Sequence, residues 1–319
     1  MTVDSKLLSV IIPAYNAAAY IGECIASILK QPECMENVNV IIVIDGATDN
    51  TLKVATTAIR GHTNIVRIIT QKNAGPSTAR NNGLDFVTTD YVTFLDADDI
   101  WLPDYLSTVL PLISECPDLI EYDAIITNRE GHALGPLKIA SAATGTTTTA
   151  NPDDFAAIFQ CYAWARVYRT STVRSHPFPE GARFEDTATT PWHHWNSRKT
   201  ISIGRALVGY RQHPTSILAT PRPKDIEEIA TAIVKAVAMY KQTRALYWQN
   251  ISYRIFHFAC QRITTQRIRN WPSGLRITKA AIADVSSPPG PLRWLQRQAT
   301  PLYVTLLYFK RKLTVTRLF

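Results

Sequence analysis

Residues 91–103 read YVTFLDADDIWLP, a mostly apolar run that ends in three closely spaced carboxylates, Asp96, Asp98 and Asp99. The apolar part predicts a buried strand, and the acids predict a site at the strand's carboxyl end. In open α/β sheets, ligands bind in the crevice at that edge. Because alternate residues of an extended chain point the same way, Asp96 and Asp98 are expected to face a ligand together.

The sequence before this stretch alternates between two patterns. Apolar runs typical of buried strands alternate with segments of helical spacing: strands at 7–13, 38–44 and 64–70, and helices at 18–31, 49–60 and 75–87. This alternation predicts an α/β fold, a doubly wound, mostly parallel, Rossmann-like sheet. Further strands are expected at 122–131, 162–171 and 200–212, with a threonine-rich loop at 141–154 and helices from Asp225 onward.

Composition favours a folded enzyme of a reducing compartment. The 319 residues are 46% hydrophobic, and the five cysteines form no CxxC pair, which argues against a zinc cluster or a disulfide framework. The N-terminus lacks the pattern of a secretory signal, and no uncharged apolar run reaches the roughly 18 residues that a membrane span needs. We therefore expect a cytoplasmic protein without a transmembrane helix.

Positive charge is concentrated at the C-terminal end. Residues 251–319 contain 12 Lys or Arg and a single acid, Asp284. The segment 292–319 mixes aromatic and cationic residues, which is typical of helices that lie on anionic membranes. Pro301 interrupts this segment, so two short helical pieces are expected. A C-terminal packing or oligomer helix explains the pattern equally well.

The acids at 96–99 predict a divalent cation. Crowded carboxylates repel one another unless a positive charge lies among them. Mg²⁺ or Mn²⁺ prefers oxygen ligands and typically binds one or two carboxylates plus substrate phosphates. A D-x-D pattern alone also fits an acidic turn or a helix cap, so it needs support from the rest of the chain.

That support comes from motifs in a fixed order. The chain contains SVIIPAYNAAAYIGECIASIL, IIVIDGATDNT, NAGPSTARNNGLDFVTTDYVTFLDADDIWLPDYL, and FEDT followed by YRQHPTSI. From about Leu8 to Ser216 it resembles the family 2 glycosyltransferases of the GT-A fold. The resemblance implies an inverting transfer of a sugar, with a UDP-sugar favoured, to a glycan or lipid-linked acceptor in cell-envelope or polysaccharide synthesis. It also implies a GT-A domain at 1–220, with a nucleotide-binding half to about 130 and an acceptor half after it. A helical basic region at 221–319 completes the chain.

The resemblance assigns donor residues one by one. Pro13 and Tyr15 are implied to pack along the nucleotide, and Asp45 is implied to recognise the nucleobase. The family usually has two adjacent acids here. Ile44 replaces the first of them, which weakens the expected preference for uridine. Gly75 and Pro76 open a helix whose N-terminus attracts anions. By the family's RN.G pattern, Arg80 belongs to the donor site, facing the diphosphate or ribose.

The metal and phosphate residues follow from the same comparison. Asp98 is implied to bind the metal directly, and Asp96 to contact ribose or reach the metal through water. Asp99 either joins them or only orders the turn. Arg211, His213 and Ser216 are implied to lie over the diphosphate, and His213 is a candidate further metal ligand.

The second acidic motif, FEDT, is expected to supply the general base of the reaction. By family position, Asp186 takes the proton from the acceptor hydroxyl, with Glu185 as neighbour or alternative. Trp164, Trp192 and Trp195 flank this motif, and they fit either an acceptor groove or a core. The roles of His193 and His194 stay open.

The sequence argues against two other functional classes. A sugar-nucleotide nucleotidyltransferase would need a glycine-rich, basic loop after the first strand, and PAYNAAAY lacks one. A non-catalytic, basic nucleic-acid-binding protein would leave Asp98 and Asp186 without a purpose, and no RNA-binding motif accompanies the tail. We therefore expect no nucleic acid partner.

Overall fold

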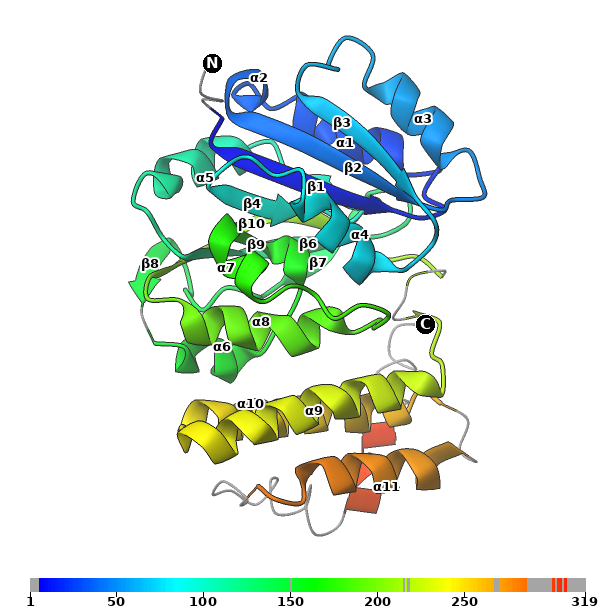
Figure 1. Ribbon diagram of the computed structural model, residues 1–319, viewed down its shortest axis with the longest axis vertical. Coiled ribbons are helices and arrows are strands. Elements are labelled where there is room, and N and C mark those ends of the chain that lie inside the picture. Colours follow the sequence, from blue (N-terminus) through cyan, green and yellow to red (C-terminus); the bar gives the residue numbers. More distant parts are fainter. Residues whose placement is uncertain are drawn as a thin grey trace. The chain divides into compact units, whose positions relative to one another are not determined.

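The computed structural model describes residues 6–149, 151–214, 216, 219–266, 270–285, 300, 301, 303–305, 307 and 308. The chain divides into two compact units, Met1–His213 and Pro214–Phe319. Figure 1 shows the strands in the first of these and long helices in the second. The division falls slightly before residue 220, where the sequence analysis placed it.

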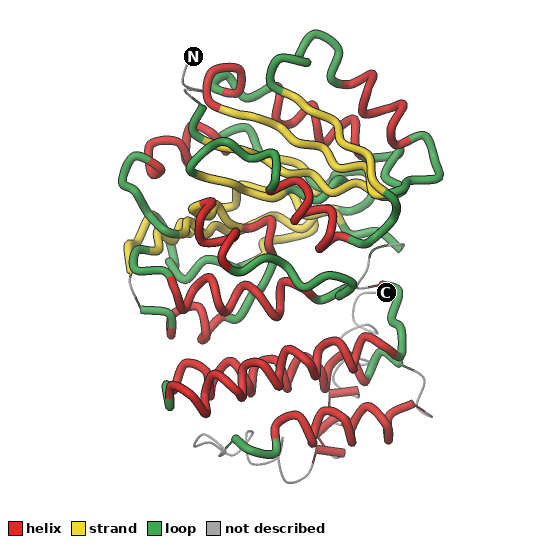
Figure 2. The backbone as a smooth tube through the Cα atoms, viewed as in Figure 1, coloured by secondary structure: helices red, strands yellow, loops and turns green. Residues whose placement is uncertain are grey.

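The first unit is built on a ten-stranded sheet with the order β3-β2-β1-β4-β9-β6-β10-β5, with β7 beside β6 and β8 beside β10. Figure 2 shows its strands as a continuous layer. Six strands run in one direction, and β5, β7, β8 and β9 run opposite to them. The bounds are β1 Leu8–Ala14, β2 Val38–Asp45, β3 Val66–Gln71, β4 Tyr91–Phe94, β5 Ile100–Trp101, β6 Leu119–Thr127, β7 Ala133–Leu137, β8 Thr146–Thr149, β9 Arg166–Arg169 and β10 Thr200–Arg211.

Helices pack on both faces of this sheet because successive side chains of a strand point to opposite sides. On β1, Val10 and Ile12 join one apolar core, with residues of α1 such as Ile25, whereas Ile11 joins the other, with Ala79 of α4. The helices are α1 Ile21–Leu29, α2 Cys34–Asn37, α3 Thr51–Ala58, α4 Pro76–Leu84, α5 Tyr105–Ile113, α6 Asp153–Ile158, α7 Thr170–Ser175 and α8 Glu185–Asn196, with a 3₁₀ turn, η1, at Ala163–Ala165. The predicted doubly wound, mostly parallel sheet is therefore confirmed.

Two segments differ from the sequence analysis. The expected loop at 141–154 contains β8, whose Thr147 pairs with Ser202 of β10. Threonine is a good strand former, and hydrogen bonding to β10 outweighs the small-residue, loop-like composition. The expected strand at 162–171 is a strand only at β9, because η1 precedes it and α7 follows it.

The second unit contains α9 (Lys224–Thr243), α10 (Leu246–Ile263) and α11 (Trp271–Ile282). Apolar residues of α9 such as Ile229 and Ile233 are fully buried, as are Ile251 and Phe256 of α10. No helix among the described residues is both long and apolar enough to cross a membrane. Most of the basic tail, including the two-piece pattern predicted for it, lies outside the described residues.

Close packing of α4 on β1 depends on Gly83. A Cβ atom at this position would lie 2.6 Å from Cγ2 of Ile11, which is fully buried. This contact fixes the distance between α4 and the sheet, and α4 carries Arg80.

Replacing Gly83 with alanine is expected to lower the free energy of unfolding by about 1–3 kcal/mol, because the new methyl group overlaps a packed side chain. Urea denaturation measures the change. Gly22→Ala in α1 is the matched control, since its Cβ would lie at an ordinary 3.4 Å from Val54. Alanine favours the helix there, so the control should be neutral or slightly more stable. Equal stability of the two variants would contradict this packing.

Candidate functional site

The acidic turn after β4 separates its three carboxylates. The N–H of Asp99 donates to the carbonyl of Asp96 at 3.0 Å, which closes the turn. The side chains of Asp96 and Asp98 stay 32% and 29% exposed. Asp99 is only 1% exposed. Two acids therefore face outward and the third faces the protein.

Asp99 anchors the end of β10. Its Oδ1 accepts the backbone N–H of Arg211 at 2.7 Å, and its Oδ2 is buried without a hydrogen-bond partner. Burial, together with the charges of Asp98 and Asp96, raises the pKa of Asp99 well above its ordinary value. This contact ties the acidic turn to the end of β10, and the role of Asp99 stays a prediction.

Asp98 lies against the imidazole of His213. Nε2 of His213 and Oδ2 of Asp98 are 2.7 Å apart, and the His213 ring stacks on Tyr20 with centroids separated by 5.1 Å. A partly exposed carboxylate suits Mg²⁺ or Mn²⁺. Within the described part of the chain, no group of three acids, histidines or cysteines could enclose a cation alone. Asp98 and His213 therefore fit a cation whose remaining ligands come from phosphate and water.

Arg80 joins the acidic turn to α8. Its Nη2 lies 2.8 Å from Oδ1 of Asp96, and its Nη1 forms an ion pair with Oε1 of Glu185, 105 residues along the chain. Arg80 is 4% exposed, and its guanidinium lies over the ring of Phe178. In this structure Arg80 binds two carboxylates, whereas the sequence analysis expected it to face the diphosphate or ribose.

The first turn of α8 presents Glu185 and Asp186. A helix N-terminus stabilises negative charge, and the N–H of Thr187 donates to Oδ1 of Asp186 at 2.7 Å. Glu185 is directed to Arg80, with its Oε2 buried and unpartnered. Oδ2 of Asp186 carries no hydrogen bond within the described residues, so Asp186 is the better placed to accept a proton.

Negative charge exceeds positive charge around Arg80. Burial raises the pKa of Glu185 to about 7 and that of Asp186 to about 6, although Arg80 opposes both shifts. The charge of Asp186 raises the pKa of Glu185 further, and that of Asp96 does the same for Asp186. One guanidinium cannot neutralise three carboxylates, so the cluster tends to hold a proton near neutral pH.

Asp45 holds the loop that leads into α4. Its buried carboxylate accepts the backbone N–H groups of Ala74 at 2.8 Å and Gly75 at 2.9 Å, and the side-chain amide of Gln71 at 2.8 Å. Gly75 has a φ of 90°, which favours glycine. The anion beside this helix start is therefore the chain's own Asp45. From the sequence, Asp45 was expected to recognise the nucleobase of the donor.

The remaining predicted donor residues lie in different settings. Tyr15 is 52% exposed, and Pro13 pairs in register with Val43. The guanidinium of Arg211 is buried and bonds Glu23 at 2.7 Å and the carbonyl of Arg129 at 2.8 Å. Ser216 falls in the second unit, so its distance from the acids is not described.

The two histidines of α8 and the tryptophan of η1 are buried in the protein. His193 donates from Nε2 to the carbonyl of His176 at 3.1 Å, and His194 accepts from Nε of Arg166 at 3.0 Å. Burial lowers the pKa of His193 to about 4 and that of His194 well below its ordinary value, so both are neutral. Trp164 is 2% exposed and belongs to the core.

Two tyrosines beside Trp164 were not among the predicted site residues. Tyr162 and Tyr210 are half-buried and stack on it. Their aromatic side chains could have indicated a binding site, but tyrosine is common in strands in general. Nothing in the local pattern distinguished these two.

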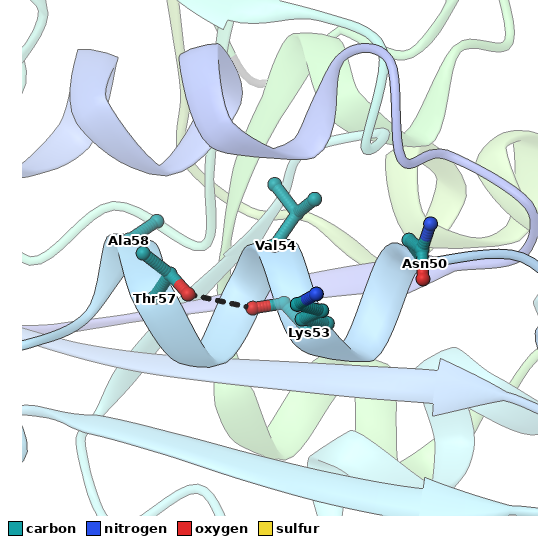
Figure 3. A pocket seen from close by; sticks show the side chains of 5 residues that line it. All are labelled: Asn50, Lys53, Val54, Thr57 and Ala58. Carbon is teal, nitrogen blue, oxygen red and sulfur yellow. Dashed lines mark hydrogen bonds between the residues drawn. The ribbon is translucent and has the colours of Figure 1, made fainter.

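A surface hollow of about 400 Å³ lies along α3, outside this acidic region (Figure 3). It is lined by Asn50, Lys53, Val54, Thr57 and Ala58. The hydroxyl of Thr57 donates to the carbonyl of Lys53 within the helix. The lining contains no acid and no histidine, so it offers no group for acid–base or metal chemistry.

Comparisons with known proteins show the family to which the chain is related. The model of glycosyl transferase family 2 matches residues 9–174. The chain is 27% identical to the glycosyltransferase GlyG of Streptococcus pneumoniae serotype 4, over 68% of the chain and 74% of GlyG. It is 26% identical to GlyA of the same organism, over 75% of the chain, and spans 35% of GlyA.

Solved structures support the fold. S. aureus TarS residues 1–349, in complex with UDP-GlcNAc, superimposes with a TM-score of 0.71 at 20% identity and covers 96% of this chain and 92% of that one. The mannosyltransferase PcManGT of Pyrobaculum calidifontis, with GDP-Man and Mn²⁺, gives a TM-score of 0.53 at 16% identity, over 95% and 86% of the two chains. The predicted GT-A fold is thus confirmed.

Replacing Arg80 with methionine is expected to lower the free energy of unfolding by about 3–5 kcal/mol, because it leaves Glu185 buried without a counter-charge. Urea denaturation at pH 8 measures this. Arg205→Met, which removes only an exposed pair with Asp104, should cost less than about 1 kcal/mol. Adding Glu185→Gln to Arg80→Met should recover part of the loss. The interpretation fails if the two arginine variants lose equal stability.

Proposed function

This chain belongs to glycosyl transferase family 2, and on that premise we propose that it moves a sugar from a UDP-sugar donor to an acceptor hydroxyl with inversion at the anomeric carbon. One observation carries the proposal. Arg80 joins Asp96 of the acidic turn to Glu185, so a donor-side carboxylate and the residue next to the proposed base Asp186 lie on one ion-pair network.

The donor side of the proposal rests on Asp98 and His213. Their contact at 2.7 Å, partly open to solvent, is where we place Mn²⁺ or Mg²⁺. When bound, the cation would offset the charge that develops on the departing diphosphate. The similar folds of TarS with UDP-GlcNAc and PcManGT with GDP-Man and Mn²⁺ support a nucleotide-sugar donor and a divalent cation.

The acceptor side rests on Asp186. Its carboxylate accepts the proton of the acceptor hydroxyl while that oxygen bonds to the anomeric carbon and the bond to the diphosphate oxygen breaks, with the electron pair leaving on the diphosphate. Glu185 is held by Arg80, and the N–H of Thr187 orients Asp186. No covalent intermediate on the chain is needed.

The acceptor is proposed from the family and from charge. A glycan or lipid-linked glycan of envelope or exopolysaccharide synthesis would be met at the inner face of a membrane. The 12 Lys or Arg against one acid in residues 251–319 would favour an anionic lipid surface there.

Asp186→Asn is expected to lower turnover by about 10²–10⁴-fold, because asparagine cannot take the proton. Asp98→Asn is expected to lower it by about 10²-fold or more through loss of charge on the metal ligand. UDP release with Mn²⁺ is measured from whichever UDP-sugar of a panel the unaltered chain turns over. Asp104→Asn, at an exposed surface pair, serves as the control and should be unchanged. Full turnover in Asp98→Asn and Asp186→Asn, with the fold intact, would refute the assignment.

The rate should depend on pH through Asp186. Its pKa is raised to about 6, and it acts as a base only when deprotonated. The kcat/KM for UDP release is therefore expected to rise about tenfold per unit below pH 6 and to level above about pH 7. Circular dichroism at each pH checks that the fold persists. A rate that is flat over this range, or that falls as the pH rises, is the contrary result.

A further inference from the structure

Two tyrosines and a tryptophan form a stack beside the acidic groups. The ring of Trp164 lies 4.9 Å from that of Tyr162 and 5.2 Å from that of Tyr210, and the tyrosine rings are 5.7 Å apart. Trp164 is buried, whereas both tyrosines are half-buried. Trp164 therefore packs behind the rings of Tyr162 and Tyr210, which are partly exposed.

Tyr162 is held next to the base. The carbonyl of Cys161 accepts the hydroxyl of Thr190 at 2.8 Å. Thr190 lies four residues after Asp186 on α8, hence on the same face of that helix. The carbonyl of Tyr162 accepts from Nη1 of the fully buried Arg166 at 2.7 Å. The backbone of Tyr162 is thus fixed on the Asp186 side of the site.

Tyr210 is held next to the acidic turn. It precedes Arg211, whose N–H bonds Asp99 at 2.7 Å, and its carbonyl accepts the hydroxyl of Thr127 at 3.4 Å. In the sheet, Gly209 pairs with Ile100, the residue directly after Asp99. The two tyrosines therefore stand on the donor and base sides of the same site.

Both phenol groups are available to a ligand as donors. Within the described residues, neither phenol oxygen has a hydrogen-bond partner or is fully buried. Burial, then the charge of Asp186, raises the pKa of Tyr162 to about 12, and burial raises that of Tyr210 further. Both hydroxyls thus keep their protons. Aromatic faces and hydroxyl donors together suit a sugar ring, which offers C–H groups and hydroxyl acceptors.

We propose that Tyr162 and Tyr210 form the subsite that binds the transferred sugar ring and help to determine which sugar is accepted. The inference rests on the proposed function, in which the sugar of the nucleotide-sugar donor lies between the acidic turn and Asp186. The nucleotide itself would lie outside this subsite.

Comparing UDP with UDP-sugars separates the two ideas. Calorimetry with Mn²⁺ measures the affinity of the unaltered chain for UDP, UDP-GlcNAc, UDP-Glc, UDP-Gal and UDP-GalNAc. The UDP-sugar that binds best then serves as the probe for Tyr162→Phe, Tyr210→Phe and the double variant, which keep the rings and lose the hydroxyls. Tyr240→Phe in α9 of the second unit is the matched control.

Each single variant is expected to bind the probe about 3- to 10-fold more weakly, the effect of one lost hydrogen bond, with unchanged affinity for UDP. The control should bind both as the unaltered chain does. Unchanged affinity for the probe in the double variant would overturn the subsite, as would an equal loss for UDP. An unaltered chain that binds every UDP-sugar no better than UDP would also overturn it. Failure to bind UDP at all would instead overturn the proposed function on which it rests.

Discussion

The site depends on the ion pairs of a single guanidinium. Arg80 binds Asp96 of the turn after β4 and Glu185 of α8. A buried ion pair is costly to break, because the remaining charge is left in a medium of low dielectric constant. Arg80 itself is positioned by α4, which packs on Ile11 through Gly83 and starts at a loop held by Asp45. The core of the sheet is thereby connected directly to the acids.

The crowded carboxylates around Arg80 also make the stability of the fold depend on pH. Glu185 has a folded pKa of about 7, above its ordinary 4.5. Between these values the folded chain binds more protons than the unfolded chain, so this group's contribution to stability is lost as the pH rises through the window. A divalent cation and a diphosphate carry charges of different size. Their binding beside Asp98 would therefore change the net charge around the carboxylates. The carboxylates around Arg80 are thus a destabilising feature that the buried sheet must offset.

Residues close in sequence were predicted well, and residues brought together by folding were not. The strand before Asp96 and the outward direction of Asp96 and Asp98 follow from periodicity and local spacing. The partners of Arg80, Arg211 and Asp45 do not, because each depends on where a distant element packs. Arg80 meets Glu185 only because the first turn of α8 lies beside α4, and no pattern near residue 80 encodes that. The Tyr162–Trp164–Tyr210 stack likewise joins η1 to β10, which pair through no local motif.

The most direct test is a crystal structure of the chain with UDP and Mn²⁺, with the metal located by its anomalous scattering. We expect Mn²⁺ at Asp98, with Arg80 still bridging Asp96 and Glu185. An Arg80 side chain turned onto the diphosphate, or a metal bound away from Asp98, would contradict the account.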